Sequence, residues 1–240
     1  MNITKESTIG DVVAVDYRTA EVFENAGIDF CCNGNRTIAE ACQKQKMDPD
    51  KIIEEIKAAL SGTKMATIDY NTWPLDLLAD YIEKTHHRYV SEKIPVILAY
   101  LDKIVSVHGN QHPELAAIRN HFFEGAQELS AHMKKEELIL FPYIRKMVKA
   151  KQDGSNGISA HFGTVKNPIQ MMMHEHDTEG ERFRKINELS NHYTVPADGC
   201  NTYKATFLSL KEFEDDLHLH IHLENNILFP KSIELEESFV

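Results

Sequence analysis

Histidine and glutamate residues recur at matched positions in two halves of this sequence, and both residue types are common ligands of divalent metal ions. The segments His132–Pro142 and His220–Pro230 are identical at six of eleven positions. In each segment a histidine precedes a glutamate by four residues, and both segments end in the same four residues, ILFP. Because chance similarity of this kind is improbable, the sequence predicts a duplicated unit.

A further histidine precedes each segment at a similar distance. His87 lies 45 residues before His132, and His176 lies 44 residues before His220. Residues four apart on an α-helix share one face, so His132 points to the same side as Glu136, and His220 points to the same side as Glu224. The predicted metal ligands are therefore His87, His132, Glu136, His176, His220 and Glu224.

Four long helices must position these ligands. Apolar residues at alternating spacings of three and four predict helices over about residues 74–107, 113–151, 167–192 and 197–232. All six ligands fall on the apolar seams of these helices, and on the third helix the seam is expected to pass through His176, Gly180 and Phe183. Without alternating strand patterns, the predicted fold is all-α, an up-down four-helix bundle over residues 73–240.

Metal binding explains why such polar residues lie on inward-facing seams. An uncompensated buried carboxylate costs several kcal/mol, roughly, so the two glutamates need partners. Two divalent metals fit, each bound by two histidines and bridged by both glutamates, with positions left open for a small ligand. Mixed imidazole and carboxylate ligands with open positions favour iron or manganese over zinc. The alternative is a pair of His–Glu interactions that only stabilise the bundle.

A small helical module is predicted to precede the bundle, over residues 1–64. A helix is expected from Ile9 to Gly27, and Thr37 with Glu40 has the form of a capping box that opens a second helix. Pro49 is expected to open a third helix, and a polar break follows at 61–63.

The module contains the adjacent thiols Cys31 and Cys32. They precede a predicted helix start, where the helix dipole is expected to lower a thiol pKa. A redox role, a thiolate ligand for transferred iron and a docking contact are possible roles, and the alternative is that both are small buried residues. Cys42 and Cys200 show no informative spacing and are interpreted as structural.

The other histidines are assigned lesser roles. His86 competes with His87, but a rotation of about 100° per residue keeps only His87 in register with the seam. His218 and His222 flank His220 by two residues and leave the seam, so they are interpreted as surface groups or as partners of the ligands. The remaining histidines are predicted to cap helices or lie at the surface.

Together, the cysteine segment Asp29–Gly34 and the three ligand segments of the bundle resemble the Repair of Iron Centres family, whose bundle is hemerythrin-like. The resemblance implies two iron ions in a non-haem di-iron centre, oxo- or hydroxo-bridged when oxidised, with the same six ligands. It also implies repair of iron–sulfur clusters in partner proteins after nitrosative or oxidative stress. The chain departs from the family at Asn33–Asn35, where paired glycines are more usual.

Other activities of such a centre stay open, among them nitric oxide reduction and the binding or sensing of oxygen or nitric oxide, so enzyme status is not assigned. The net charge of −11 disfavours nucleic-acid binding. Apolar runs are too short to cross a bilayer, and the polar start predicts a cytoplasmic location. A monomer and a homodimer are both compatible with the sequence.

Overall fold

The computed structural model describes residues 3–61, 68–155 and 160–239. The predicted break at 61–63 and the predicted end of the N-terminal module at residue 64 therefore lie largely outside the described residues. The described chain contains helices and turns, and its only β-type pairings are the isolated bridges Thr8–Thr37 and Ala160–Gly163. The predicted all-α fold is confirmed for this part of the chain.

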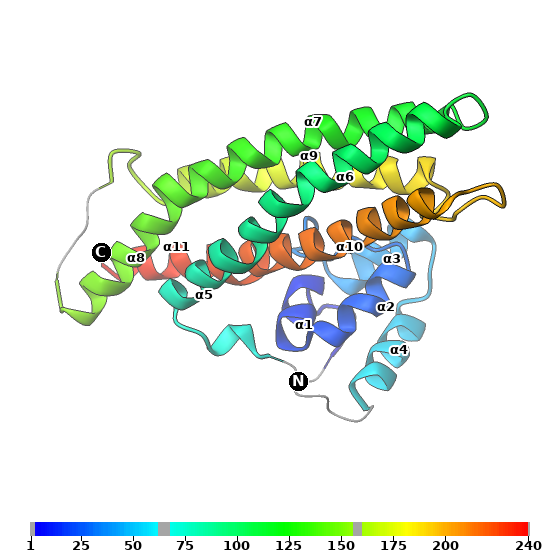
Figure 1. Ribbon diagram of the computed structural model, residues 1–240. Coiled ribbons are helices and arrows are strands. Elements are labelled where there is room, and N and C mark those ends of the chain that lie inside the picture. Colours follow the sequence, from blue (N-terminus) through cyan, green and yellow to red (C-terminus); the bar gives the residue numbers. More distant parts are fainter. Residues whose placement is uncertain (1–2, 62–67, 156–159, 240) are drawn as a thin grey trace.

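Four long helices run alternately up and down to form the bundle (Figure 1). Helix α7 packs against α6 and α9, and α6 packs against α10. The bundle segments are α5 (Leu75–Tyr81), η3 (Ile82–His87), α6 (Arg88–His108), α7 (Glu114–Lys135), η4 (Glu136–Leu140), α8 (Phe141–Gln152), α9 (Lys166–Leu189), α10 (Asn201–Leu223), η5 (Glu224–Leu228) and α11 (Phe229–Glu237).

Three of the four long helices contain a π-helical segment, which the prediction of continuous α-helices missed. Segment η3 ends at His87, η4 begins at Glu136 and η5 begins at Glu224. Pro142 and Pro230 lie in the first turn of the α-helices that follow η4 and η5. Proline has no N–H to donate and its ring clashes with the carbonyl four residues earlier, so the turn before each proline widens. The repeated ILFP sequence thus places a wide turn at each glutamate.

The N-terminal module consists of short helices, namely α1 (Ile9–Val15), η1 (Tyr17–Thr19), α2 (Ala20–Asn25), α3 (Ile38–Gln45) and α4 (Pro49–Ser61). The predicted continuous helix from Ile9 to Gly27 is wrong. Asp16 adopts an extended backbone (φ −154°, ψ 107°), and its side chain accepts a hydrogen bond from the Arg18 N–H. The predicted capping box of Thr37 and Glu40 is confirmed.

The module packs on the bundle and shares its hydrophobic core. Helix α1 lies against α10 and η5, and the module appears below α10 in Figure 1. One continuous cluster of buried side chains joins Ile9 and Phe23 of the module to Leu101 and Phe213 of the bundle. A second cluster fills the opposite end of the bundle, around α5, α8 and α11. The metal-ligand candidates lie where these two apolar regions meet.

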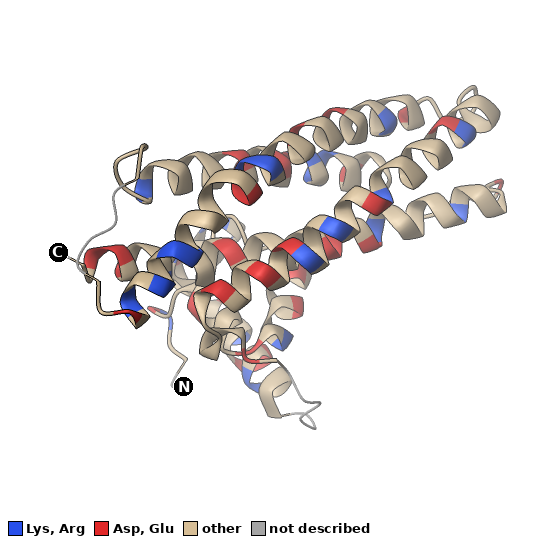
Figure 2. Cartoon of the chain, turned by 60° about the vertical axis from the view of Figure 1, so that its left-hand side comes forward, with Lys and Arg blue, Asp and Glu red and all other residues tan. Residues whose placement is uncertain are grey.

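Basic and acidic residues both occur along the helices, as the ribbon in Figure 2 shows. Among the described residues, we find no helix whose length and apolar character would allow it to cross a membrane.

Candidate metal centre

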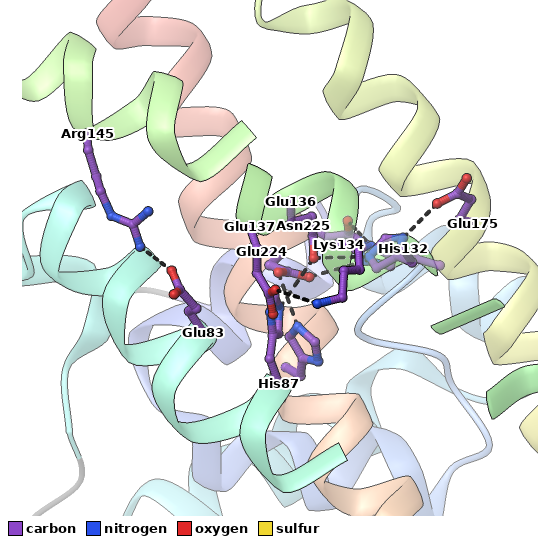
Figure 3. Close-up of polar contacts among 12 residues, drawn as sticks. Glu83, His87, His132, Lys134, Glu136, Glu137, Arg145, Glu175, Glu224 and Asn225 are labelled. Carbon is purple, nitrogen blue, oxygen red and sulfur yellow. Dashed lines mark hydrogen bonds and ion pairs between the residues drawn. The ribbon is translucent and has the colours of Figure 1, made fainter. Parts of the chain in front are cut away.

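The six predicted ligands converge in the middle of the bundle, each from a different turn of its four helices (Figure 3 labels His87, His132, Glu136 and Glu224). All six residues are buried, with at most 3% of any of them exposed. Their ligand atoms form two groups, His87–Glu136–His220–Glu224 and His132–Glu136–His176–Glu224, within each of which the atoms lie less than 4.8 Å apart. Both glutamates belong to both groups.

Each glutamate lies between two histidines. One oxygen of Glu136 is 3.4 Å from the Nε2 atom of His87 and 3.3 Å from that of His132. The oxygens of Glu224 lie 3.2 Å from the Nε2 atoms of both His176 and His220. All four imidazoles therefore turn Nε2 toward the carboxylates, as ligands of a shared pair of cations would.

Buried polar atoms without hydrogen bonds indicate whether these residues suit a metal ion. Among the described residues, both oxygens of Glu136, one oxygen of Glu224 and Nε2 of His87 are buried and make no hydrogen bond. A buried carboxylate without such bonds is costly, and coordination of a cation would satisfy it. The contacts at 3.3–3.4 Å to Glu136 approach hydrogen-bond length without the required alignment. The donor set therefore fits divalent metals better than two self-contained ion pairs.

The outward-facing nitrogen atoms of three histidines are held by neighbours. The Nδ1 atom of His87 lies 3.0 Å from Glu137, and that of His132 lies 2.8 Å from Glu175, which also pairs with Lys135. The Nδ1 atom of His176 lies 2.9 Å from the carboxamide oxygen of Asn225. Such partners fix the orientation and tautomer of metal-binding imidazoles. The Nδ1 atom of His220 has no partner among the described residues.

The electrostatics of the metal-free centre favour charged glutamates. Burial raises the pKa of Glu224, but the adjacent His220 and His176 outweigh it and hold this pKa well below its usual value. Burial lowers the pKa of His132, but Glu136 and Glu175 outweigh it and raise this pKa to about 10. The centre thus keeps its carboxylates ionised, which is the form that binds metal.

Two histidines outside the predicted ligand set are also buried. His86 stacks on His220, with ring centroids 5.5 Å apart, and its Nδ1 lies 2.9 Å from Asp216, but His86 belongs to neither metal-binding group. His222 leaves the seam as predicted, yet its interpretation as a surface group is wrong. The N-terminal module covers it with Tyr17 and Phe30, and burial lowers its pKa to about 3.

The predicted seam through Gly180 is also wrong. The side chain that turns inward on α9 is Glu179, which is 3% exposed, whereas Gly180 faces Cys32. Burial raises the pKa of Glu179 to about 7, against the opposing effect of Arg182. Glu179 lines a cavity of about 210 Å³ with His132 and His176, so this cavity reaches the second metal-binding group from the surface.

Cys31 and Cys32 lie beside the metal centre. Their sulfur atoms are 3.8 Å apart, and the Cys32 thiol donates to the backbone carbonyl of His176 at 3.4 Å. The carboxylate of Asp29 accepts hydrogen bonds from the backbone N–H groups of both cysteines. These two thiols and Asp29 form a third potential metal-binding group, on the wall of a cavity of about 550 Å³.

The expected lowering of the thiol pKa by a helix dipole is wrong for Cys31. Helix α3 begins only at Ile38, and the dipole acts over a single turn. The hydrogen bond with Cys32 and burial instead raise the pKa of Cys31 well above its usual value. Cys42 is buried, whereas Cys200, interpreted from the sequence as structural, is exposed at the start of α10, and the influence of His108 lowers its pKa to about 7.

Comparison with known proteins agrees with this geometry. Residues 78–232 match the family described as the hemerythrin HHE cation binding domain, and residues 5–60 match ScdA_N, a domain of unknown function. The chain is 30% identical to the iron-sulfur cluster repair protein ScdA of Staphylococcus epidermidis over 230 residues, covering 95% of this chain and 99% of the relative. It is 32% identical to the iron-sulfur cluster repair protein YtfE of Pectobacterium atrosepticum over 233 residues, covering 95% and 97%.

Proposed function

This chain belongs to the family of iron-sulfur cluster repair proteins with a hemerythrin HHE cation binding domain, and on that premise we propose that it repairs iron–sulfur clusters in partner proteins. The clusters would be those damaged by nitrosative or oxidative stress, in the cytoplasm. Two iron ions would occupy the bundle, one in each metal-binding group.

The observation that supports this proposal is the sharing of Glu136 and Glu224 by both groups. Two carboxylates common to two sets of histidines suit a pair of adjacent cations, whereas one cation would leave two of the imidazoles without a ligand role. Imidazole and carboxylate together suit iron, which bound here would supply redox chemistry and open coordination positions. Glu137, Glu175 and Asn225 would hold the imidazole rings in place.

Iron is also the cargo that a damaged cluster needs. Each group offers two imidazoles and two shared carboxylates, which leaves positions open on an ion that takes more than four ligands. The cavity beside His132 and His176 reaches this centre and is lined by Glu128, Glu175 and Glu179. Iron held in this way is exchangeable, and we propose that the protein supplies it to the damaged cluster.

The thiol pair is the second element of the proposal. Cys31 and Cys32 lie between the second metal-binding group and the 550 Å³ cavity, and thiolates are strong ligands for iron. We assign them the role of receiving iron as it leaves the centre. Deprotonation of Cys31 is unfavourable in the metal-free protein, so a cation would have to displace its proton.

An iron-transfer assay tests the proposal. The protein would be loaded with ⁵⁷Fe without oxygen and mixed with an iron–sulfur enzyme whose cluster has been damaged by nitric oxide. We expect the enzyme to regain activity and its cluster to contain ⁵⁷Fe. The metal-free protein and the Glu224→Gln variant serve as controls. Recovery that is equal with the metal-free protein, or a repaired cluster without the isotope, would contradict iron supply.

Nitric oxide reduction is a second candidate because shared carboxylates would place two irons side by side, where two nitric oxide molecules can meet. The same protein should then consume nitric oxide over many turnovers when given an electron donor. Consumption that stops at one reaction per centre would instead favour binding or sensing of nitric oxide or oxygen.

A further inference from the structure

One side chain contacts both the metal centre and the cysteine loop, which we define as residues 28–34. Asn225 is the second residue of η5, directly after Glu224, and only 7% of it is exposed. Its amide nitrogen donates to the backbone carbonyl of Cys31 at 3.1 Å, and its amide oxygen lies 2.9 Å from Nδ1 of His176. The carboxamide thus spans the space between a predicted ligand and the thiol pair.

These two contacts determine which ring nitrogen of His176 carries the hydrogen. A backbone carbonyl can only accept a hydrogen bond, so the NH₂ group of Asn225 must face Cys31. The amide oxygen then faces His176 and can only accept, so the Nδ1 atom of His176 must bear the hydrogen. This tautomer leaves the lone pair of Nε2 directed at the metal-binding group, which is the form a metal requires.

The internal repeat shows that an amide is not the only residue that could orient the ring. Glu137 occupies the position of the first half that corresponds to Asn225, 88 residues earlier, and accepts from Nδ1 of His87 in the same way. A carboxylate is an acceptor only, so it could not donate to the carbonyl of Cys31. The amide at position 225 therefore adds a contact to the loop that the equivalent glutamate could not make.

The next residue secures the same loop. The amide nitrogen of Asn226 donates to the backbone carbonyl of Phe30 at 3.1 Å. Helix α1 also holds the loop, because the N–H of Gly10 donates a hydrogen bond to the carbonyl of Gly34 at 2.7 Å. Among these loop contacts with η5, only that of Asn225 continues to a predicted ligand, which is why it, and not Asn226, can connect the two sites.

We propose that Asn225 is a positioning residue that couples the cysteine loop to the metal centre. When the loop is docked, its carbonyl orients the amide, which orients His176 for the metal. Metal bound at His176 in turn holds the amide in the orientation that keeps the loop docked. The second half of this statement rests on the proposed metal centre, whereas the first half concerns the metal-free protein alone.

Alkylation of individual thiols tests both halves. Wild type, Asn225→Asp and Glu137→Gln would be treated with iodoacetamide without oxygen, each metal-free and loaded with Fe²⁺, and peptide masses would give a rate for each cysteine. Asn225→Asp keeps an acceptor for His176 and loses the donor to Cys31. Glu137→Gln changes the equivalent position without touching the loop. Alkylation of buried Cys42 would reveal unfolding of the module, and the alkylation rate of exposed Cys200 would show that the activity of the reagent is the same in every sample.

In the metal-free proteins, we expect Asn225→Asp to raise the alkylation rate of Cys32 by about two- to tenfold, as for the loss of one buried hydrogen bond. Glu137→Gln should match wild type, and the rates of Cys42 and Cys200 should not change. An unchanged rate of Cys32 in Asn225→Asp would overturn the docking role, whether or not the protein binds iron.

With iron bound, alkylation of Cys32 should slow further in wild type, while in Asn225→Asp the rates with and without iron should be equal. Protection by iron that persists in Asn225→Asp would overturn the coupling, because iron would then be acting on the thiol directly. If Asn225→Asp exposes Cys42 through misfolding, wild type still decides: no protection of Cys32 by bound iron overturns the coupling. Measured iron content separates this result from failure of the metal centre itself.

Discussion

Glu136 and Glu224 each lie between two histidines that belong to different metal-binding groups. Glu136 contacts His87 of one group and His132 of the other, at 3.4 and 3.3 Å, and Glu224 does the same with His220 and His176 at 3.2 Å. Because the two glutamates are common to both groups, the two proposed irons depend on each other through these side chains and not through the imidazoles.

This sharing predicts different stoichiometries for glutamate and histidine variants. Glu224→Gln should lose nearly all iron, because both groups lose a negatively charged ligand. His220→Ala and His132→Ala should each lose the iron of their own group and keep about half of the wild-type content. Iron per chain would be measured on protein purified without oxygen. Equal iron in Glu224→Gln and wild type would contradict the shared role.

Neighbouring histidines provide matched controls for the ligands. His218→Ala should keep the wild-type iron content, since His218 leaves the seam and belongs to neither metal-binding group. His86→Ala should also keep its iron, although it removes a ring that stacks on His220. Iron content and helical content would be measured together. Loss of iron from His218→Ala equal to that from His220→Ala would show that the assignment of helix faces is wrong.

The cysteine pair should matter for transfer and not for binding. A double variant, Cys31→Ala with Cys32→Ala, removes both thiols but none of the six predicted ligands, so its iron content should match wild type. The rate of ⁵⁷Fe transfer to a damaged cluster should fall at least severalfold. Cys42→Ala is the control within the same module. A double variant that transfers iron at the wild-type rate would remove the thiols from the proposed function.

Glu179 should make stability depend on pH. Its pKa is about 7 in the folded protein and 4.5 as a model value, so the folded state retains a proton that the unfolded chain has lost between these values. Stability is therefore highest below about pH 4.5 with respect to this group, and decreases as the pH rises toward 7. One pKa unit corresponds to about 1.4 kcal/mol, so the full loss is of order 3 kcal/mol.

The variant Glu179→Gln cannot ionise, and it should remove this part of the pH dependence. Urea unfolding of the metal-free proteins at pH 5 and pH 8 would measure the difference in free energy of unfolding for each. Glu181→Gln, an exposed change on the same helix, should behave as wild type. If Glu179→Gln and wild type lose stability equally between the two pH values, Glu179 does not titrate as described.

Gly34 should be required for docking of the module. A Cβ atom at this position would lie 2.6 Å from both the carbonyl oxygen of Phe30 and the side-chain oxygen of Asn226. Gly34→Ala should therefore destabilise the metal-free protein by about 1–3 kcal/mol, the usual cost of overpacking. Asn35→Ala, at the exposed neighbouring position, is the control. Thermal unfolding would compare the two, and equal midpoints would show that the loop accommodates the methyl group.

The predicted ligand set followed from local spacing rules that hold in any α-helix, whatever packs against it. A histidine four residues before a glutamate shares its face in any helix, and the repeat at Glu136 and Glu224 showed that the spacing was not accidental. The order of long helices likewise followed from apolar spacing and from the turns between them. The π-helical segments did not, although their extra residue rotates the side chains that follow: after Glu136 the buried residue is Leu140, while Ile139 is 37% exposed. Pro142 and Pro230 were the available signal.

Only the tertiary structure decided which polar side chains are covered. His222 and Glu179 look like outer residues of a four-helix bundle, but the N-terminal module covers the first and the packing of α9 turns the second inward. Asn225 contacts Cys31, which lies 194 residues away in the sequence, and His176, which lies 49 residues away. Local sequence specifies which face of a helix a residue occupies, whereas burial and the partners of a side chain depend on what packs against that face, and that is set by contacts between distant segments.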